Sequence, residues 1–302
     1  MIRPHLPRFL TTGLTIAFVV YVLTGCSFES SPILHPKGPV TETERDLMLL
    51  ATGIMAFTLI PVYLLTFWCC WRYRADKNGC YRPDWHKSWQ VELFIWTGPV
   101  VIVAILGYLV YVYTYRLDPY KALDNQQNTF KVQAVALNWK WLFIYPEQNV
   151  ATVNELVFPS HRTLSLEITS DTVMTSFMIP ALGGQIYAMA GMTTHLNLQS
   201  YKSGRFTGRN TQFSGRGFAG MVFDVQALSR HDFERWLETV RRADNTLDSQ
   251  QYLNLTQPDT HHPVEYFSAV TPDLFDKIIA RYDEKADEKS SALPKPEPYN
   301  VE

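Results

Sequence analysis

Apolar residues are concentrated in the first third of the chain. Two runs, residues 47–71 and 91–115, are almost free of charge, and Glu92 at the start of the second is the exception. Each run exceeds the roughly 20 residues that a helix needs to cross the hydrocarbon core of a bilayer. Tryptophan and tyrosine cluster toward the ends of the runs, as they do at membrane–water interfaces. The pattern predicts one transmembrane helix in each run.

The segment between the two predicted spans indicates their orientation. Residues 72–90 contain five basic and two acidic residues. Short loops rich in lysine and arginine stay on the cytoplasmic side of the membrane. The segment before the first span and the domain after the second are therefore expected in the periplasm.

The first 25 residues follow the plan of a bacterial secretory signal. Arg3 and Arg8 form a basic region ahead of a mostly apolar run, residues 9–22, and small residues then lead to Cys26. This order predicts a lipoprotein signal peptide over residues 1–25, with lipid attached to Cys26. The alternative is an uncleaved membrane anchor in which the cysteine occurs by chance.

A different period begins after the second span. Apolar and polar residues alternate in short stretches such as 130–136, 164–168 and 221–225, and glycine and proline separate them. Period-two alternation with such punctuation is typical of β-strands. Residues 116–228 are therefore expected to form a Greek-key β-sandwich or barrel.

Beyond this domain the pattern becomes helical. Ser229 is the predicted N-cap of a helix that ends at Arg241, and a second helix is expected over residues 272–282. Residues 229–283 form a predicted helical extension, and residues 284–302 are expected to be disordered because they lack apolar periodicity. The predicted fold class is membrane α plus all-β: a two-helix transmembrane hairpin within residues 26–115, then a β-sandwich with C-terminal helices.

Charge and cysteine content restrict the possible functions. A formal net charge of −2 provides no basic surface for nucleic acid. Cys69, Cys70 and Cys80 lie in or beside the cytoplasmic end of the first span, where we interpret them as small apolar side chains. No cysteine follows Cys80, so the predicted periplasmic domain offers neither disulfides nor thiolate metal ligands.

Four short motifs in the second half of the chain follow a specific order. They are residues 139–141 (WKW), 171–180 (DTVMTSFMIP), 182–184 (LGG) and 190–192 (AGM). With two spans and a periplasmic sandwich, the chain resembles subunit II of the haem–copper terminal oxidases. The resemblance extends to Ile279 and implies that the sandwich is a cupredoxin-like domain.

The copper ligands of the cytochrome c oxidase branch of this family are not present. That branch holds a dinuclear copper site with cysteines, histidines, a methionine and an acidic residue, because thiolate and imidazole suit copper. At the matching positions this sequence has Thr175, Phe213, Gly215, Gly217, Met221 and Asp224. The resemblance therefore implies a cupredoxin shell without copper, in which Phe213, Phe218 and Met221 are expected to fill the space.

Further stretches resemble the quinol oxidase branch, in particular the proteobacterial cytochrome bo-type ubiquinol oxidase. They are residues 143–155, 185–192, 264–267 and 272–275. The resemblance implies a non-catalytic subunit II of a proton-pumping inner-membrane complex that carries electrons from ubiquinol to oxygen in respiration. No cofactor is expected in this chain, and haems and copper are expected in a partner, subunit I. Small membrane subunits and membrane lipids are further expected partners.

Four other residues are candidate site residues. The resemblance places Glu92 near the entrance of a proton-uptake path, although an acid at a helix start is also favourable without any such role. Trp139, Trp141 and Tyr145 are candidate interface aromatics toward subunit I, and the alternative is packing at the junction between domain and membrane.

Two other functions are compatible with the architecture. A cytochrome c oxidase subunit would need its own copper ligands, which do not occur at the matching positions. A membrane-anchored lipoprotein for copper delivery or assembly would need an exposed cluster of methionine and histidine, and the sequence has no such cluster with convincing spacing.

Overall fold

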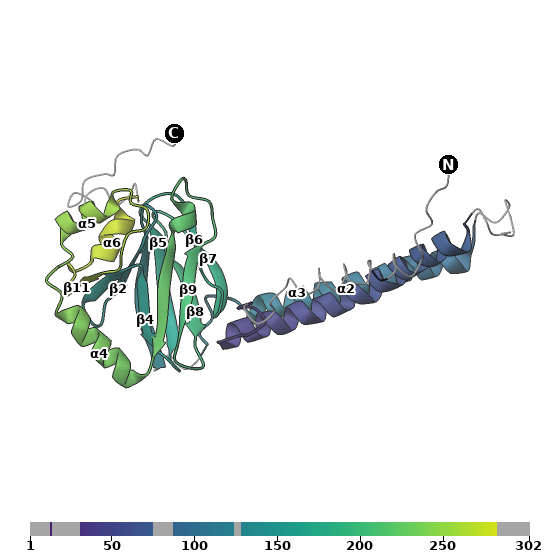
Figure 1. The fold of residues 1–302 in the computed structure, drawn as a ribbon, viewed down its shortest axis with the longest axis horizontal. Coiled ribbons are helices and arrows are strands. Elements are labelled where there is room, and N and C mark those ends of the chain that lie inside the picture. The colour runs from purple at the N-terminus through teal and green to yellow at the C-terminus, as the bar shows by residue number, and fades with distance from the viewer. Residues whose placement is uncertain (1–12, 14–30, 75–86, 124–127, 283–302) are drawn as a thin grey trace.

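The structure is a computed structural model that describes residues 13, 31–74, 87–123 and 128–282. The predicted signal peptide except Gly13, Cys26, Cys80, most of the loop between the spans and the predicted disordered tail lie outside the described residues. A long two-helix hairpin projects from one side of a β-sandwich, beside strands β7 and β8 (Figure 1).

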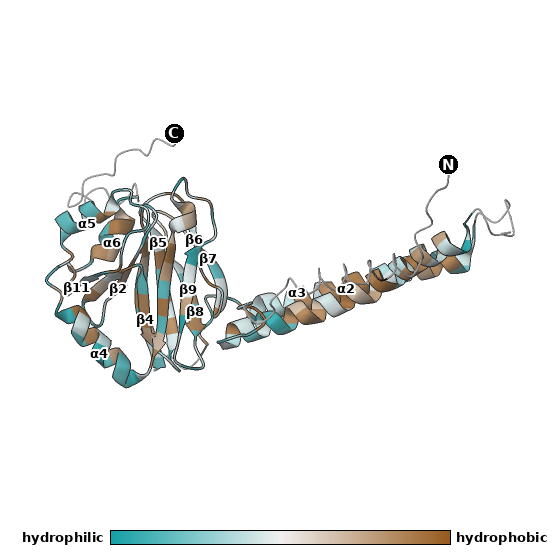
Figure 2. Cartoon of the chain, in the orientation of Figure 1, coloured by the Kyte–Doolittle hydropathy of each residue, from teal (hydrophilic) through white to brown (hydrophobic). Residues whose placement is uncertain are grey.

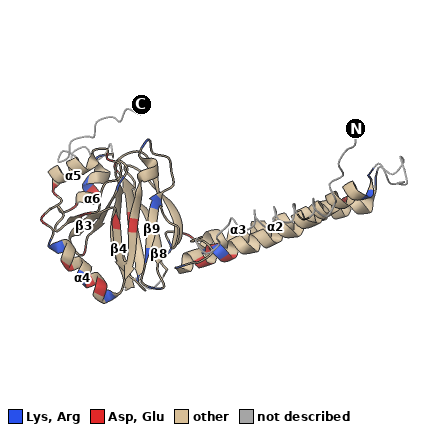
Figure 3. Ribbon diagram, viewed as in Figure 1, with Lys and Arg blue, Asp and Glu red and all other residues tan. Residues whose placement is uncertain are grey.

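The hairpin consists of α2 (Pro39–Arg72) and α3 (Trp89–Arg116). Both predicted spans lie within these helices, which are long and apolar enough to cross a membrane. Helix α2 begins ahead of its apolar run, so its first turns are polar. Apolar residues predominate along the middle of the hairpin (Figure 2), whereas charged residues gather at its two ends (Figure 3).

The sandwich contains a six-stranded sheet, β11-β3-β2-β1-β5-β8, and a five-stranded sheet, β4-β10-β9-β6-β7. Strand pairs are antiparallel except for β1 with β5 and β4 with β10, which are parallel. This architecture confirms the predicted hairpin and β-sandwich. The strands are β1 (Thr129–Ala136), β2 (Trp141–Tyr145), β3 (Val150–Val153), β4 (Glu155–Pro159), β5 (Thr163–Ser170), β6 (Thr175–Ile179), β7 (Gly183–Ala188), β8 (Thr194–Gln199), β9 (Gly204–Asn210), β10 (Val222–Leu228) and β11 (Glu265–Phe267).

The predicted alternation places one face of each strand in the core. Leu164, Leu166 and Ile168 of β5 are fully buried, while Ser165 and Glu167 between them are only partly buried. An aromatic cluster fills the space between the sheets, and the ring centroids of Phe177 and Phe223 lie 5.1 Å apart. Burial of this apolar surface is the main stabilising contribution to the sandwich.

The C-terminal extension contains the predicted helices and two further elements. It contains α4 (Arg230–Arg241), α5 (Ser249–Thr256) and α6 (Leu274–Ala280), and the short strand β11. Helix α5 and strand β11 were not predicted; β11 is too short to show a period in sequence, and its pairing with β3 defines it. Ser229 caps α4 as predicted, by accepting a hydrogen bond from the backbone N–H of Asp232.

The extension covers the outer face of the six-stranded sheet. Its buried apolar residues form a second core with the outward side chains of β1, β2 and β3. On the extension these residues are Leu247, Tyr252, Leu255, Phe267, Leu274, Phe275 and Ile278. This part of the sheet is thus buried on both faces, which explains the fully buried strands β2 and β3.

Candidate functional site

The positions that match copper ligands differ in burial. Thr175 at the start of β6 and Met221 before β10 are both buried, at 1% exposure. The sulfur of Met221 accepts a hydrogen bond from the Nδ2 of Asn210 at 3.4 Å. The Asp224 side chain, in contrast, is on the exposed face of β10, and Phe213 is 71% exposed. Phe213 therefore does not fill the space as predicted, because its ring lies at the surface against Phe218, which is itself only partly buried.

The indole of Trp139 occupies the space beside two of these positions. A Cβ atom on Gly217 would lie 2.2–2.5 Å from the Cδ2, Cγ and Cε3 atoms of Trp139, and a Cβ on Gly215 would lie 3.4 Å from its Cζ2. The Trp139 Nε1–H donates to the carbonyl oxygen of Ser214 at 2.7 Å. Trp139 has a φ of 64°, a left-handed conformation that is uncommon for a bulky residue.

These residues do not fit a dinuclear copper site. The donor set has no thiolate or imidazole at the matching positions, and Trp139 takes the room that a side chain at position 217 would need. Among the described residues, no group of three or more histidine, cysteine, aspartate or glutamate side chains could hold a metal ion.

Two of the three candidate interface aromatics are core residues. Trp141 and Tyr145 have no exposed surface. The Tyr145 hydroxyl accepts a hydrogen bond from the backbone N–H of Val157 at 2.9 Å, and burial raises the pKa of this phenol. The prediction that these two side chains form an interface is wrong, because β2 is the buried strand between β1 and β3. Trp139 is partly buried.

A buried ion pair joins the C-terminal extension to the loop that precedes β6. The Nη1 of Arg281 lies 3.2 and 3.1 Å from the two carboxylate oxygens of Asp171. The hydroxyls of Tyr252 and Tyr282 donate to the same carboxylate at 2.7 and 3.1 Å. Burial raises the pKa of Asp171, and the Arg281 guanidinium opposes this shift. Sequence reasoning missed this group, which we call the Asp171 cluster (Asp171, Tyr252, Arg281 and Tyr282).

A second buried carboxylate holds α4 and β11 against the sandwich. Glu155 accepts hydrogen bonds from the hydroxyl of Tyr266 at 2.7 Å, the indole of Trp236 at 3.2 Å and the amide of Gln226 at 2.8 Å. The three donors come from β11, α4 and β10. Together with the Asp171 cluster, this arrangement fixes the extension at both of its ends.

Polar contacts also fix the hairpin to the sandwich. The backbone N–H of Lys37 donates to Ala181 and its carbonyl accepts from Tyr201. The Glu44 carboxylate accepts from the N–H of Gly184 at 3.2 Å, and the Tyr201 hydroxyl donates to Glu42 at 2.6 Å. The start of α2 is therefore hydrogen-bonded to the sandwich through the side chains of Glu42 and Glu44.

Comparison with known proteins agrees with this architecture. Residues 107–228 match the family described as cytochrome c oxidase subunit II, periplasmic domain, and residues 241–285 match the COX aromatic rich motif. The chain is 42% identical to cytochrome bo(3) ubiquinol oxidase subunit 2 of Pseudomonas putida, over 94% of this chain and 89% of that protein. It is 44% identical to the protein of the same name from Pseudomonas aeruginosa, over 90% of this chain and 81% of that protein.

The chain belongs to the ubiquinol oxidase subunit 2 family. The periplasmic domain of cytochrome oxidase subunit II from Bradyrhizobium japonicum is a more distant match, 23% identical over 40% of this chain and 95% of that chain, with a TM-score of 0.36. The segment of this chain that matches the aromatic rich motif contains Tyr252, Arg281 and Tyr282 of the Asp171 cluster.

Glu92 lies in the first turn of α3, at the end of the hairpin far from the sandwich, and is partly exposed. A carboxylate near a helix N-terminus is stabilised by the helix dipole. Its assignment to a proton path stays a prediction.

Proposed function

We propose that this chain is subunit 2 of a ubiquinol oxidase complex in a bacterial inner membrane. The complex would oxidise ubiquinol, reduce oxygen to water and move protons outward. Similarity to relatives of that name over nearly the whole chain supports the proposal. The two helices of the hairpin, whose apolar side chains are exposed, agree with a protein that spans a membrane.

Within the complex, the chain contributes structure rather than a redox centre. The observation that carries this proposal is the Trp139 indole packed over Gly217, at a position where the copper-bearing branch has a ligand. Ubiquinol is lipid-soluble and can deliver its electrons inside the membrane to a partner subunit that holds the haems and copper. The sandwich then needs no relay, and its role is to support assembly and cap the periplasmic side of the partner.

The topology and modification of the chain are part of the same proposal. The loop after α2 lies in the cytoplasm and the sandwich in the periplasm, as the distribution of basic residues indicates. The signal peptide ends before Cys26, which carries the lipid. Glu92 then lies at the cytoplasmic side of the membrane, where protons for oxygen reduction are taken up.

Purification through a tag on this chain tests the proposal. We expect haem to co-purify, oxygen uptake to respond to ubiquinol and not to reduced cytochrome c, and the uptake to disappear when the gene for this chain is deleted. A chain that arrives alone, without haem, would instead support a separate membrane lipoprotein.

A further inference from the structure

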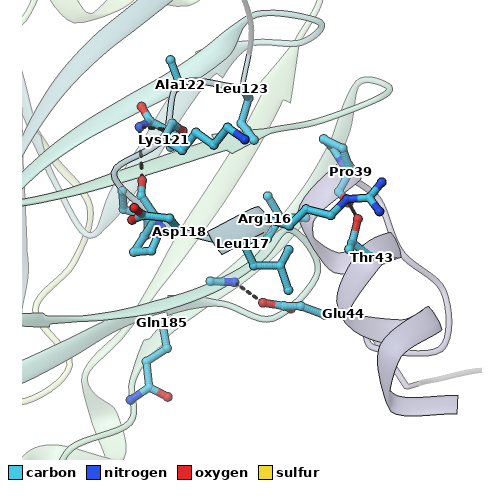
Figure 4. Close-up of a pocket in the computed structure, with 15 residues that line it drawn as sticks. Pro39, Thr43, Glu44, Arg116, Leu117, Asp118, Lys121, Ala122, Leu123 and Gln185 are labelled. Atoms are coloured by element: carbon cyan, nitrogen blue, oxygen red, sulfur yellow. Dashed lines mark hydrogen bonds between the residues drawn. The ribbon is translucent and has the colours of Figure 1, made fainter. Parts of the chain in front are cut away.

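A pocket lies where the membrane hairpin meets the sandwich. It has a volume of about 350 Å³ and is formed by the start of α2, the end of α3, residues 117–123 and strands β7 and β8 (Figure 4). Three exposed tyrosines, Tyr108, Tyr111 and Tyr115, mark the end of α3 immediately before Arg116. Tyrosine belts lie at the level of lipid head groups, so the pocket opens at that depth.

The pocket carries charges of both signs. Arg116 and Lys121 are exposed, and neither forms an ion pair with a described residue. In Figure 4 the Arg116 side chain extends toward Pro39 and Thr43 in the first turns of α2. Gly38 provides no side-chain cap there, so the positive end of the α2 dipole adds to the two cations. This side of the pocket suits a phosphate.

The other charges of the pocket are two carboxylates. Glu44 uses its Oε1 to accept from the backbone of Gly184 at 3.2 Å, and Asp118 uses its Oδ1 to accept from the backbone N–H of Tyr120 at 3.0 Å. Each carboxylate therefore keeps one oxygen that can accept a hydrogen bond from an ammonium group. A ligand with a phosphate alone would place its charge near two carboxylates without compensation.

We propose that this pocket binds the phosphoethanolamine head group of a phospholipid. Arg116 and Lys121 contact the phosphate, and Glu44 and Asp118 accept from the primary ammonium. A choline head group has no N–H to donate, and a glycerol head group has no positive charge for the carboxylates. Both are therefore weaker ligands.

An apolar groove along the hairpin agrees with a lipid as the source of the head group. The groove has a volume of about 710 Å³, is open to the surface, and is lined mostly by apolar residues of α2 and α3, from Leu49 to Phe57 and from Phe94 to Ile105. Leu50 of the groove follows Thr43 of the pocket by seven residues, about 10.5 Å along the helix axis and on the same helix face. An acyl chain that leaves the pocket toward the membrane interior would run along this groove.

Native mass spectrometry of the purified complex tests the proposal. The complex is taken from nanodiscs with equal parts phosphatidylethanolamine and phosphatidylglycerol in phosphatidylcholine, and retained lipids are counted. We expect preferential retention of phosphatidylethanolamine, a retention at least about tenfold lower in the Arg116→Gln/Lys121→Gln variant, and a weaker preference over phosphatidylglycerol in Glu44→Gln. Arg72→Gln, at the opposite end of α2, is the matched control and should behave as wild type.

Three results would overturn the proposal. They are equal retention of the two lipids by the wild-type complex, unchanged retention in the Arg116→Gln/Lys121→Gln variant, and displacement of the lipid by millimolar inorganic phosphate. The last would indicate a site for a free anion. If no partner subunit co-purifies, the same experiment applies to the full chain alone, because the proposal requires only insertion in a membrane. Failure of the proposed function is thereby separated from failure of the lipid site.

Discussion

The two halves of this protein bury their apolar residues in different ways. In the sandwich, Phe177 has no exposed surface and lies among other aromatic rings. In the hairpin, Phe57 and Phe94 are 78% and 82% exposed in the isolated chain. The sandwich therefore encloses its own core, whereas the hairpin depends on lipid and partner helices to cover it.

The two halves also differ in where they place charged groups. The sandwich buries carboxylates, in the Asp171 cluster and at Glu155, and gives each several hydrogen-bond donors. The hairpin keeps its charges at its two ends (Figure 3). Since unpaired charge is costly in both a protein core and a bilayer, the sandwich compensates charge and the hairpin avoids it.

The largest expected effect tests the burial difference directly. Phe177→Ala should lower the free energy of unfolding of the sandwich by about 3–5 kcal/mol, because it leaves a cavity in the core. Phe57→Ala should change the same quantity by less than about 0.5 kcal/mol. Urea unfolding of the full chain in detergent, followed by circular dichroism of the strands, measures both. Equal effects would contradict the comparison.

The Asp171 cluster tests whether a buried ion pair contributes more to stability than an exposed one. Asp171→Asn leaves Arg281 buried without its counterion and should cost about 3–5 kcal/mol in the unfolding measurement. The control is Glu234→Gln, which removes the exposed partner of Arg230, 3.3 Å away, and should cost at most about 1 kcal/mol. A small loss in Asp171→Asn would mean that the extension is not held by this pair.

Alanine substitution of two glycines compares a closely packed position in the sandwich with an open one in the hairpin. Gly217→Ala places a methyl group within 2.5 Å of the Trp139 ring, so the ring must move, at a cost of about 1–3 kcal/mol. Gly53→Ala in α2 meets nothing within 4 Å in the isolated chain. It should be neutral or slightly stabilising in the same assay. Adding Trp139→Ala to Gly217→Ala should recover part of the loss; a purely additive loss would contradict direct packing.

The smallest effect concerns high pH. Burial raises the pKa of Tyr252 well above its usual value of about 10. Above pH 10 the unfolded chain loses this proton while the folded chain keeps it, so stability falls as pH rises, by at most about 1.4 kcal/mol per pH unit. Tyr252→Phe should remove one such contribution to the slope of stability between pH 10 and 11. An unchanged slope would show that Tyr252 does not remain protonated in the fold.

The sequence predicts those features that are local and periodic. The spans, the alternation in β5 and the Ser229 cap all follow from nearby residues, and the structure confirms them. Two contacts could not be predicted, because their residues lie far apart in the sequence. Trp139 bonds Ser214, 75 positions away, and Arg281 pairs with Asp171, 110 positions away. The absence of copper ligands at the matching positions can be read from the sequence. That the Trp139 ring packs against Gly217 can be seen only in the structure.

We propose that the sandwich holds no redox centre, and one measurement tests this proposal directly. Electron paramagnetic resonance of the oxidised complex, purified through this chain, is recorded together with its near-infrared absorption. We expect haem signals from the partner subunit, with neither a mixed-valence dinuclear copper signal nor the corresponding near-infrared band. A mixed-valence copper signal that disappears on mutation of the sandwich would contradict the claim.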